Sequence, residues 1–371
     1  VACPRAGGVY YWDYTTASDR AKAIKDLDNA NLAPTVGLQV LVSDIDRHII
    51  VLGADPIDTS INARSDVLDP LLIAWCDQEN PLDWEPKITN TAGSLRASVG
   101  SGIIGGLRAR QETLIWTDAA LYSLQFVGSP YTFGLTLINE GVSLIGPNAA
   151  INAPSGVYWM DRKGFYRYTG SIEPVPSSVH SYVFDDLNEA QSFQIFGFLN
   201  KQFDEVGWFY CSGSSESIGI PGLPIPSNTI DRYVTYNYVE NTWAIGKLSR
   251  TAWLDEGLVS YPRAAGGDGD NYYLYKQETG NDDDGSPMDN VYLESGDFDL
   301  DEGEEVQFIR RMIPDVRFTG SGGSDQTLNV VLKTRNYPAE SLTTESTSAF
   351  TASTTVVEMR ARARQAVLRF E

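Results

Sequence analysis

Paired short strands, each pair with an aromatic residue just before an aspartate, recur along this chain and constrain its fold more than any other feature. Residues 112–118 and 121–127 form one pair, joined by a two-residue turn. A second pair comprises residues 156–161 and 165–168, with Gly164 in the turn. Alternating side chains around tight turns are typical of β-hairpins. We therefore expect an all-β protein with few short helices.

The distance between equivalent hairpins has the size of one propeller blade. Trp116 and Trp159 occupy the same place in successive hairpins and lie 43 positions apart, and further copies begin at Gly7, Arg232 and Gly266. Repeats of about 40 to 50 residues with several short strands each are typical of β-propellers. A β-sandwich stays open as the alternative, because it also places turns at regular short intervals. The uneven intervals leave the number of blades open.

The character of the chain changes near residue 305, where longer alternating runs begin. These runs are residues 312–318, 327–334, 350–357 and 366–370. We predict a β-propeller in residues 1–304 and a β-sandwich-like domain in residues 305–371. Capping patterns predict short helices at residues 21–27 and 188–195. Because the chain lacks an initial Met and ends in an alternating run, we expect missing strands at the start of the propeller and a truncated second domain.

Charge and composition exclude several classes of protein. The 28 Lys and Arg against 49 Asp and Glu give a net charge of −21, the wrong sign for a basic DNA-binding domain. Two histidines and three cysteines without a recognisable spacing predict neither a zinc site nor a disulfide framework. The sequence contains no long apolar run. We expect no metal, no cofactor and no membrane span.

The histidines do not indicate an enzyme. His48 stands at the head of a predicted strand and His180 in a predicted loop, and neither neighbours a nucleophile motif. We therefore predict no catalytic residues and no enzymatic activity. A glycan-binding or glycan-degrading propeller stays open as the alternative. It would need an aromatic-lined pocket with two convergent carboxylates.

Two segments are candidates for surface function. Residues 265–305 hold 14 acidic residues, and Asp282, Asp283 and Asp284 are the candidates to face a channel, with a solvated outer loop as the alternative. Their spacing does not fit a calcium-binding loop. The Gly-, Ser- and Pro-rich loop 212–227 carries apolar residues that we expect at an interface. They are Ile218, Ile220, Leu223 and Ile225.

A basic run closes the chain. Arg360, Arg362 and Arg364 alternate with small apolar residues, which places them on one face of a predicted strand. We expect them to pair with acids of a neighbouring strand or subunit. Direct contact with DNA is the alternative.

Segments spread over most of the chain carry a resemblance to one protein family. They are Gly7–Asp13, Leu41–His48, Asn90–Gly93, Ile115–Asp118, Phe133–Gly134, Gly146–Ala150, Val157–Asp161 and Arg310–Asp315. In this order they resemble the tail nozzle, or tail hub, proteins of short-tailed phages and related prophages. Some of these are known as packaged-DNA stabilisation proteins.

The resemblance implies a structural virion protein of the phage tail, assembled in the host cytoplasm. It implies a β-propeller subunit that forms a ring of several copies, commonly six, below the portal and adaptor proteins and next to tail fibre or needle proteins. The ring would line the DNA exit channel, retain the packaged DNA and pass it during ejection without sequence-specific binding. No catalytic residues are implied.

Overall fold

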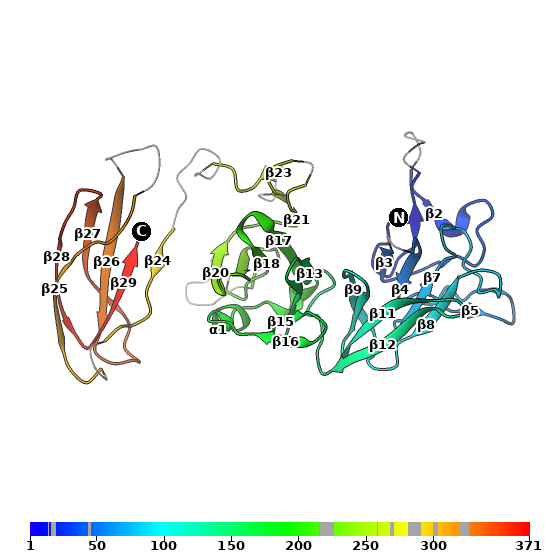
Figure 1. Ribbon diagram of the computed structural model, residues 1–371, viewed down its shortest axis with the longest axis horizontal. Coiled ribbons are helices and arrows are strands. Elements are labelled where there is room, and N and C mark those ends of the chain that lie inside the picture. Colours follow the sequence, from blue (N-terminus) through cyan, green and yellow to red (C-terminus); the bar gives the residue numbers. More distant parts are fainter. Residues whose placement is uncertain are drawn as a thin grey trace. The chain divides into compact units, whose positions relative to one another are not determined.

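In a computed structural model the protein is described over most of its length and is all-β, as predicted (Figure 1). The described residues are 1–13, 15, 20–43, 46–214, 226–257, 259–267, 271–280, 291–299, 303–318 and 326–371. The helical elements among them are α1 (His180–Phe184) and the 3-10 turns η1 (Ile24–Asp26), η2 (Glu189–Gln194) and η3 (Lys201–Phe203). The chain divides into two compact units, residues 1–279 and 280–371.

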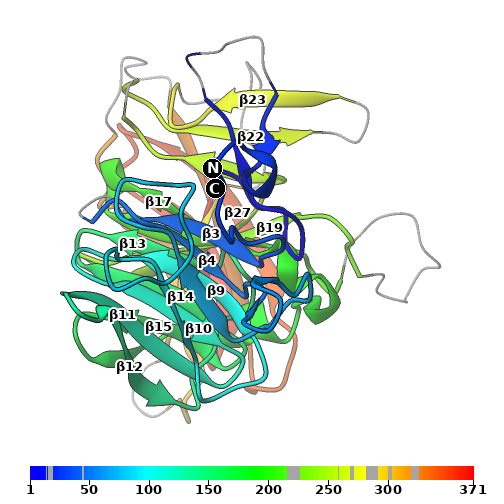
Figure 2. The same cartoon turned by 90° about the vertical axis from the view of Figure 1, so that its right-hand side faces the viewer.

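Three antiparallel sheets of four strands follow one another in the middle of the first unit (Figure 2). Sheet B comprises β9 (Ile103–Arg108), β10 (Thr113–Thr117), β11 (Ala120–Gly128) and β12 (Thr132–Glu140). Sheet C comprises β13 (Ala150–Ala153), β14 (Gly156–Asp161), β15 (Gly164–Tyr168) and β16 (Ile172–Val175). Sheet D comprises β17 (Phe196–Asn200), β18 (Glu205–Tyr210), β19 (Arg232–Asn237) and β20 (Thr242–Lys247). Neighbouring strands are consecutive in the chain, which confirms the predicted hairpins.

Two further sheets flank these three in the chain. Sheet A comprises β3 (Gln39–Val42), β4 (Ile49–Leu52), β7 (Leu72–Trp75) and β8 (Gly93–Arg96), with the small hairpin of β5 (Ile57–Asp58) and β6 (Ala63–Arg64) inserted. Sheet E comprises β21 (Ala252–Leu254), β22 (Arg263–Gly267) and β23 (Tyr272–Lys276). A short pair, β1 (Tyr10–Tyr11) and β2 (Lys22–Ala23), precedes them.

The first strands of successive sheets contact one another in chain order: β3 contacts β9, β9 contacts β13, β13 contacts β17 and β17 contacts β21. Trp116, Trp159 and Trp208 lie on the second strands of sheets B, C and D and are almost completely buried. The repeated hairpin therefore supplies each sheet with one large core side chain. No closed propeller is evident in the part of the chain that the structure describes, so the β-propeller stays a prediction.

The second unit combines a four-stranded sheet with a two-stranded pair. Sheet F has the order β24 (Leu293–Glu294), β29 (Gln365–Phe370), β26 (Thr327–Arg335) and β27 (Thr343–Thr351), and the pair is β25 (Gln307–Met312) with β28 (Val357–Ala363). Side chains of β28 alternate strictly between buried and exposed. Met359 and Ala361 on its buried face share one core with Leu332 and Phe350 of sheet F. The β-sandwich-like fold of this unit stays a prediction.

The division between the units lies earlier than the predicted boundary at 304/305. The units divide after Thr279. Strand β24 pairs with β29, and Phe298 exchanges backbone hydrogen bonds with Ala366. These long-range pairings assign residues around 293–298 to the second unit, although their acidic composition resembles the segment before them.

Several local predictions also differ from the structure. Residues 312–318 were expected to form a strand, but β25 ends at Met312. The predicted strand 350–357 is divided by a turn between β27 and β28. The predicted helix at residues 21–27 is reduced to β2 and the turn η1, and the one at 188–195 to η2, without a side-chain cap. His180, predicted in a loop, begins α1.

Candidate functional site

The site residues named from the sequence cannot be placed in the structure. Asp282, Asp283 and Asp284 lie outside the described residues. The apolar residues of the interface loop, Ile218, Ile220, Leu223 and Ile225, also lie outside them. Their proposed roles at a channel and at an interface therefore stay predictions.

The aspartates that follow the core aromatics tie loops to the sheets. Asp118 follows Trp116, and its carboxylate accepts hydrogen bonds from the Ser101 backbone N–H (2.7 Å) and hydroxyl (2.5 Å). These hydrogen bonds, the hydroxyl one most strongly, lower the pKa of Asp118. Asp231, which follows Ile230 and not a core aromatic, accepts the same two bonds from Ser212, at 2.8 and 2.6 Å. The recurrent aspartate therefore has a structural use at Asp118.

Asp161 is in the equivalent place in sheet C, yet its surroundings differ. It is buried and accepts hydrogen bonds from the backbone N–H groups of Ser143 (3.2 Å) and Arg162 (2.6 Å). The Ser143 hydroxyl instead donates to the Thr117 carbonyl. Without a hydroxyl donor, burial dominates and raises the pKa of Asp161.

Asp118 and Asp161 both line a cleft of about 610 Å³ between residues of sheets B and C. Glu140 adds a third carboxylate, and Phe193 is the aromatic residue among the described lining residues. The glycan alternative calls for an aromatic-lined pocket and convergent carboxylates. Here the carboxylates of Asp118 and Asp161 already accept hydrogen bonds, mainly from neighbouring loops. Glu140 is thus the better candidate for chemistry in this cleft.

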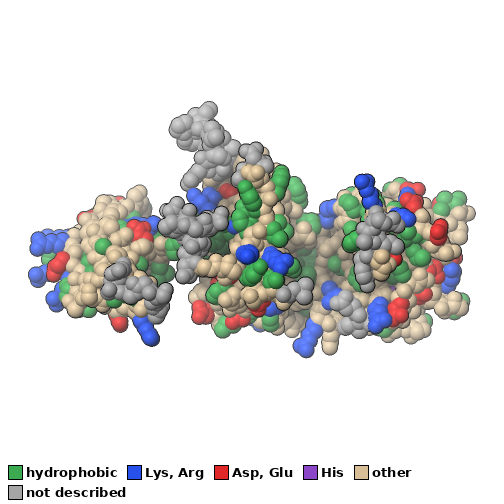
Figure 3. Space-filling model, turned by 90° about the horizontal axis from the view of Figure 1, so that it is seen from above, with side chains coloured by type: hydrophobic (Ala, Val, Ile, Leu, Met, Phe, Trp, Pro, Cys, Tyr) green, Lys and Arg blue, Asp and Glu red, His purple; other side chains and the backbone are tan. Residues whose placement is uncertain are grey.

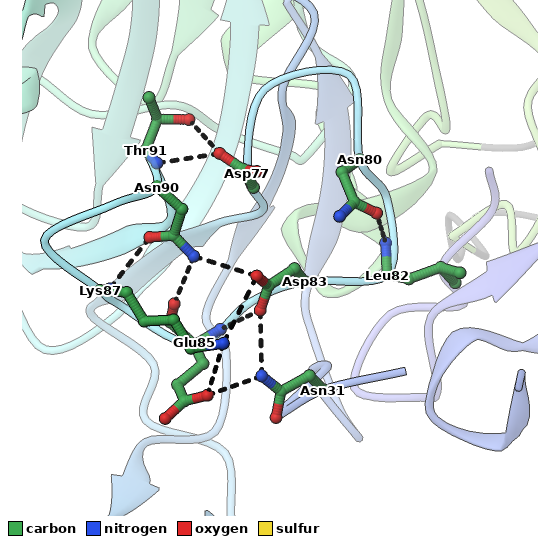
Figure 4. Close-up of polar contacts among 9 residues, drawn as sticks. All are labelled: Asn31, Asp77, Asn80, Leu82, Asp83, Glu85, Lys87, Asn90 and Thr91. Carbon is green, nitrogen blue, oxygen red and sulfur yellow. Dashed lines mark hydrogen bonds and ion pairs between the residues drawn. The ribbon is translucent and has the colours of Figure 1, made fainter. Parts of the chain in front are cut away.

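A second polar cluster lies in the loop between β7 and β8 (Figure 4). The side-chain amide of Asn31 donates to Asp83 (3.1 Å) and Glu85 (2.7 Å), and that of Asn90 donates to Asp83 (3.1 Å). The Lys87 ammonium lies 2.9 Å from the Glu85 carboxylate. Each charged group here has a partner within the cluster, so the network fixes the loop against the segment that carries Asn31.

His48 borders the same loop. It precedes β4, as expected for the head of a strand, and its Nε2 lies 3.0 Å from the Thr91 hydroxyl. That hydroxyl donates a hydrogen bond to the Asp77 carboxylate, so Asp77 is bonded to Thr91 and not to His48. The ring packs edge-on against Phe133, and burial lowers the pKa of His48. A neutral histidine between an apolar ring and one hydroxyl is a packed core residue.

The thiols and carboxylates do not assemble into a metal centre in the described part of the chain. No three His, Cys, Asp or Glu side chains gather there as ligands. Cys3, Cys76 and Cys211 are free, and burial raises the pKa of both Cys76 and Cys211 to about 11. No helix among the described residues is long and apolar enough to cross a membrane.

The basic run at the end of the chain partly follows its prediction. Arg360 and Arg362 share the exposed face of β28, whereas Arg364 lies in the turn after it and donates to the Gly303 carbonyl. Strand pairing adds Arg310 and Arg311 of β25, which are also exposed. These two arginines were missed from the sequence, because about 50 residues separate them from their partners and only the pairing of the strands unites them.

No protein-family model matches the chain, and no curated protein matches it significantly.

Proposed function

We propose that this protein is a structural component of a phage tail, a subunit of the ring that forms the tail nozzle. One observation carries the proposal. Sheets B, C and D are successive four-stranded meanders whose first strands contact each other in chain order. Blades of a β-propeller pack in this manner, and the nozzle family that the sequence resembles is built on a propeller.

The segments of the resemblance support this interpretation. Ile115–Asp118 and Val157–Asp161 occupy the same place in sheets B and C, at the end of the second strand and the start of its turn. Their tryptophans fill the core, and their aspartates accept hydrogen bonds from neighbouring loops. These residues therefore serve a repeated scaffold.

In the proposed role, copies of the chain form a closed ring, with six as the expected number. Portal and adaptor proteins lie above it and tail fibre or needle proteins contact it. A net charge of −21 per chain disfavours tight binding of DNA phosphates. A channel lined by such subunits would retain the packaged genome and let it slide out during ejection.

Imaging and mass measurement of the purified chain test the proposal. We expect negative-stain micrographs to show closed rings with a central hole, and light scattering to give one stoichiometry. A chain that stays monomeric at high protein concentration contradicts the ring.

The glycan alternative has its own test. If bacterial polysaccharide is hydrolysed, and Glu140→Gln in the cleft between sheets B and C abolishes that turnover, the tail protein is an enzyme and the structural proposal is incomplete. The matched control is Glu240→Gln, an exposed acid outside the residues that line the cleft. We expect no turnover with any of the three proteins.

A further inference from the structure

One exposed face of the second unit concentrates arginines. Arg310 and Arg311 of β25 and Arg360 and Arg362 of β28 are all exposed, and with Phe308 they form what is called here the arginine face. Phe308 pairs with Arg362 across the two strands. Figure 3 shows Lys and Arg side chains gathered at the left-hand edge of the second unit, on the side where Figure 1 shows β25 and β28.

The arginine face differs from sheet F in how its cations are neutralised. In sheet F, Lys333 pairs with Glu294, Arg335 with Asp297 and Arg369 with Glu371. None of the four arginines of the arginine face forms an ion pair with another described residue. Glu358, opposite Arg311, is the acid that shares the exposed face of β28 with Arg360 and Arg362. The face therefore holds several cations with little local compensation.

Apolar side chains interrupt and flank these cations. Phe308 is 60% exposed, Val306 52% and Ile313 68%. Binding of DNA phosphates needs cations but no apolar surface. Arginine together with aromatic residues is instead enriched at the centres of protein interfaces. The composition of the face thus favours a protein partner with an acidic surface over a nucleic acid.

The first unit of the chain itself is acidic overall. Residues 1–279 contain 32 Asp and Glu against 19 Lys and Arg, a net charge of −13. Two copies brought together at random repel each other, because each carries −21. A stable assembly of copies therefore needs a contact in which opposite charges meet, and the arginine face offers one.

We propose that the arginine face binds an acidic surface on the first unit of a second copy of this chain. This inference rests on the ring assembly proposed above and names its contact. Two arginine faces repel each other, so the contact cannot join identical patches. Contacts between different patches that repeat head-to-tail generate closed rings or open chains.

Charge reversal at the face is the first test. We expect the double variant Arg360→Glu, Arg362→Glu to weaken self-association about a hundredfold or more in sedimentation experiments, since charges across an interface are lost and replaced by repulsion. The control is Arg20→Glu, Arg110→Glu, which changes the net charge equally at exposed arginines outside the face. It should alter self-association by less than about threefold, because distant exposed charges are screened.

Thermal unfolding of both double variants checks that each is folded. Because all four substituted side chains are exposed, we expect unfolding temperatures close to that of the unaltered chain. Equal weakening by both pairs of substitutions would show a general charge effect and overturn the proposal. Salt-dependent binding of duplex DNA by the unaltered chain that only the Arg360, Arg362 variant loses, with unchanged self-association, would assign the face to nucleic acid and also overturn it.

Photo-crosslinking locates the partner. A benzoylphenylalanine replaces Phe308, and a mixture of isotopically light and heavy chains distinguishes adducts between copies from those within one copy. We expect adducts between copies that map to residues 1–279. Adducts that map to the second unit of the other copy contradict a contact with the first unit.

These outcomes separate the inference from the proposed function. Rings that persist in the Arg360→Glu, Arg362→Glu variant would refute the inference and leave the nozzle proposal standing. Open chains that depend on the arginine face would refute the closed ring and leave the inference standing. A chain that never self-associates refutes both.

Discussion

The two units build their cores from different side chains. All eight tryptophans lie within residues 1–279, and Trp116, Trp159 and Trp208 on the second strands of sheets B, C and D are almost completely buried. The second unit has Phe350 as its largest fully buried side chain, beside small residues such as Ala361 and Ala366. Indole rings fill wide spaces between successive sheets, whereas alanines let β28 approach sheet F. The core of the first unit can therefore be predicted from its repeated tryptophans, whereas no comparable sequence pattern indicates the core of the second unit.

The largest expected effect breaks the first core alone. Trp159→Ala removes a side chain with no exposed surface and should cost about 3 to 5 kcal/mol of unfolding free energy, because it leaves a cavity. Denaturant titration followed by tryptophan fluorescence measures it. Hydrogen exchange in β26 of the second unit should stay unchanged. Equal loss of protection there would show that the two units fold as one.

The reciprocal change tests the second core. Phe350→Ala should cost the second unit about 3 to 5 kcal/mol by the same mechanism. Because this unit contains no tryptophan, the fluorescence transition should not move, while amide protection in β26 and β29 falls. A shifted fluorescence midpoint would contradict the separation of the cores.

Within the first core, hydrogen bonding separates two otherwise similar tryptophans. The indole N–H of Trp208 donates to the Ala149 carbonyl at 2.9 Å, whereas that of Trp159 has no acceptor among the described residues. Trp208→Phe should therefore be about 1 kcal/mol more destabilising than Trp159→Phe. Urea unfolding of the two variants side by side measures the difference. Equal costs would mean that the hydrogen bond of Trp208 adds no stability.

A smaller effect distinguishes the equivalent aspartates of sheets B and C through pH. The Ser101 hydroxyl holds the pKa of Asp118 below its ordinary 3.8, so Asp118 stabilises the fold above pH 3.8 and loses this as the pH falls through its folded pKa. Burial raises the pKa of Asp161, so its charge destabilises the fold above the folded pKa, and protonation relieves this as the pH falls toward 3.8.

Unfolding free energies of the two variants and the unaltered chain, measured at about pH 3, 5 and 7, check these signs. The cost of Asp118→Asn should be greatest at neutral pH and shrink in acid. The cost of Asp161→Asn should instead be smaller at neutral pH than near pH 4. Parallel curves for the two variants would refute the distinction between the two sites.

The hairpins of the first unit were predictable because the residues that determine each one lie close together in the sequence. The residues around Trp116 and Trp159 alternate, turn at a small or polar residue and supply one core side chain, all within about 15 positions. The strands β10, β11, β14 and β15 accordingly lie where the sequence placed them. Short capping patterns were weaker guides, because tertiary pairing at Lys22 and Ala23 overrode the predicted helix.

Long-range pairing accounts for what the sequence did not reveal. The hydrogen-bond partners of Asp118 and Asp231 are Ser101 and Ser212, which lie 17 and 19 positions away on other loops, and no local pattern selects them. Phe308 and Arg362 meet only because β25 pairs with β28. The unit boundary moved for the same reason, since β24 belongs to the sheet that β29 completes.

The two buried thiols are built-in probes of local opening in this protein. Cys76 follows the third strand of sheet A and Cys211 follows β18 of sheet D, and with a pKa of about 11 each is about 10⁻⁴ thiolate at neutral pH. Because both side chains are also buried, a thiol reagent reaches them only when the surrounding sheet opens. The modification rate of each thiol reports how often the sheet around it opens, without any introduced probe. Comparing the two rates shows whether sheet A or sheet D opens more readily.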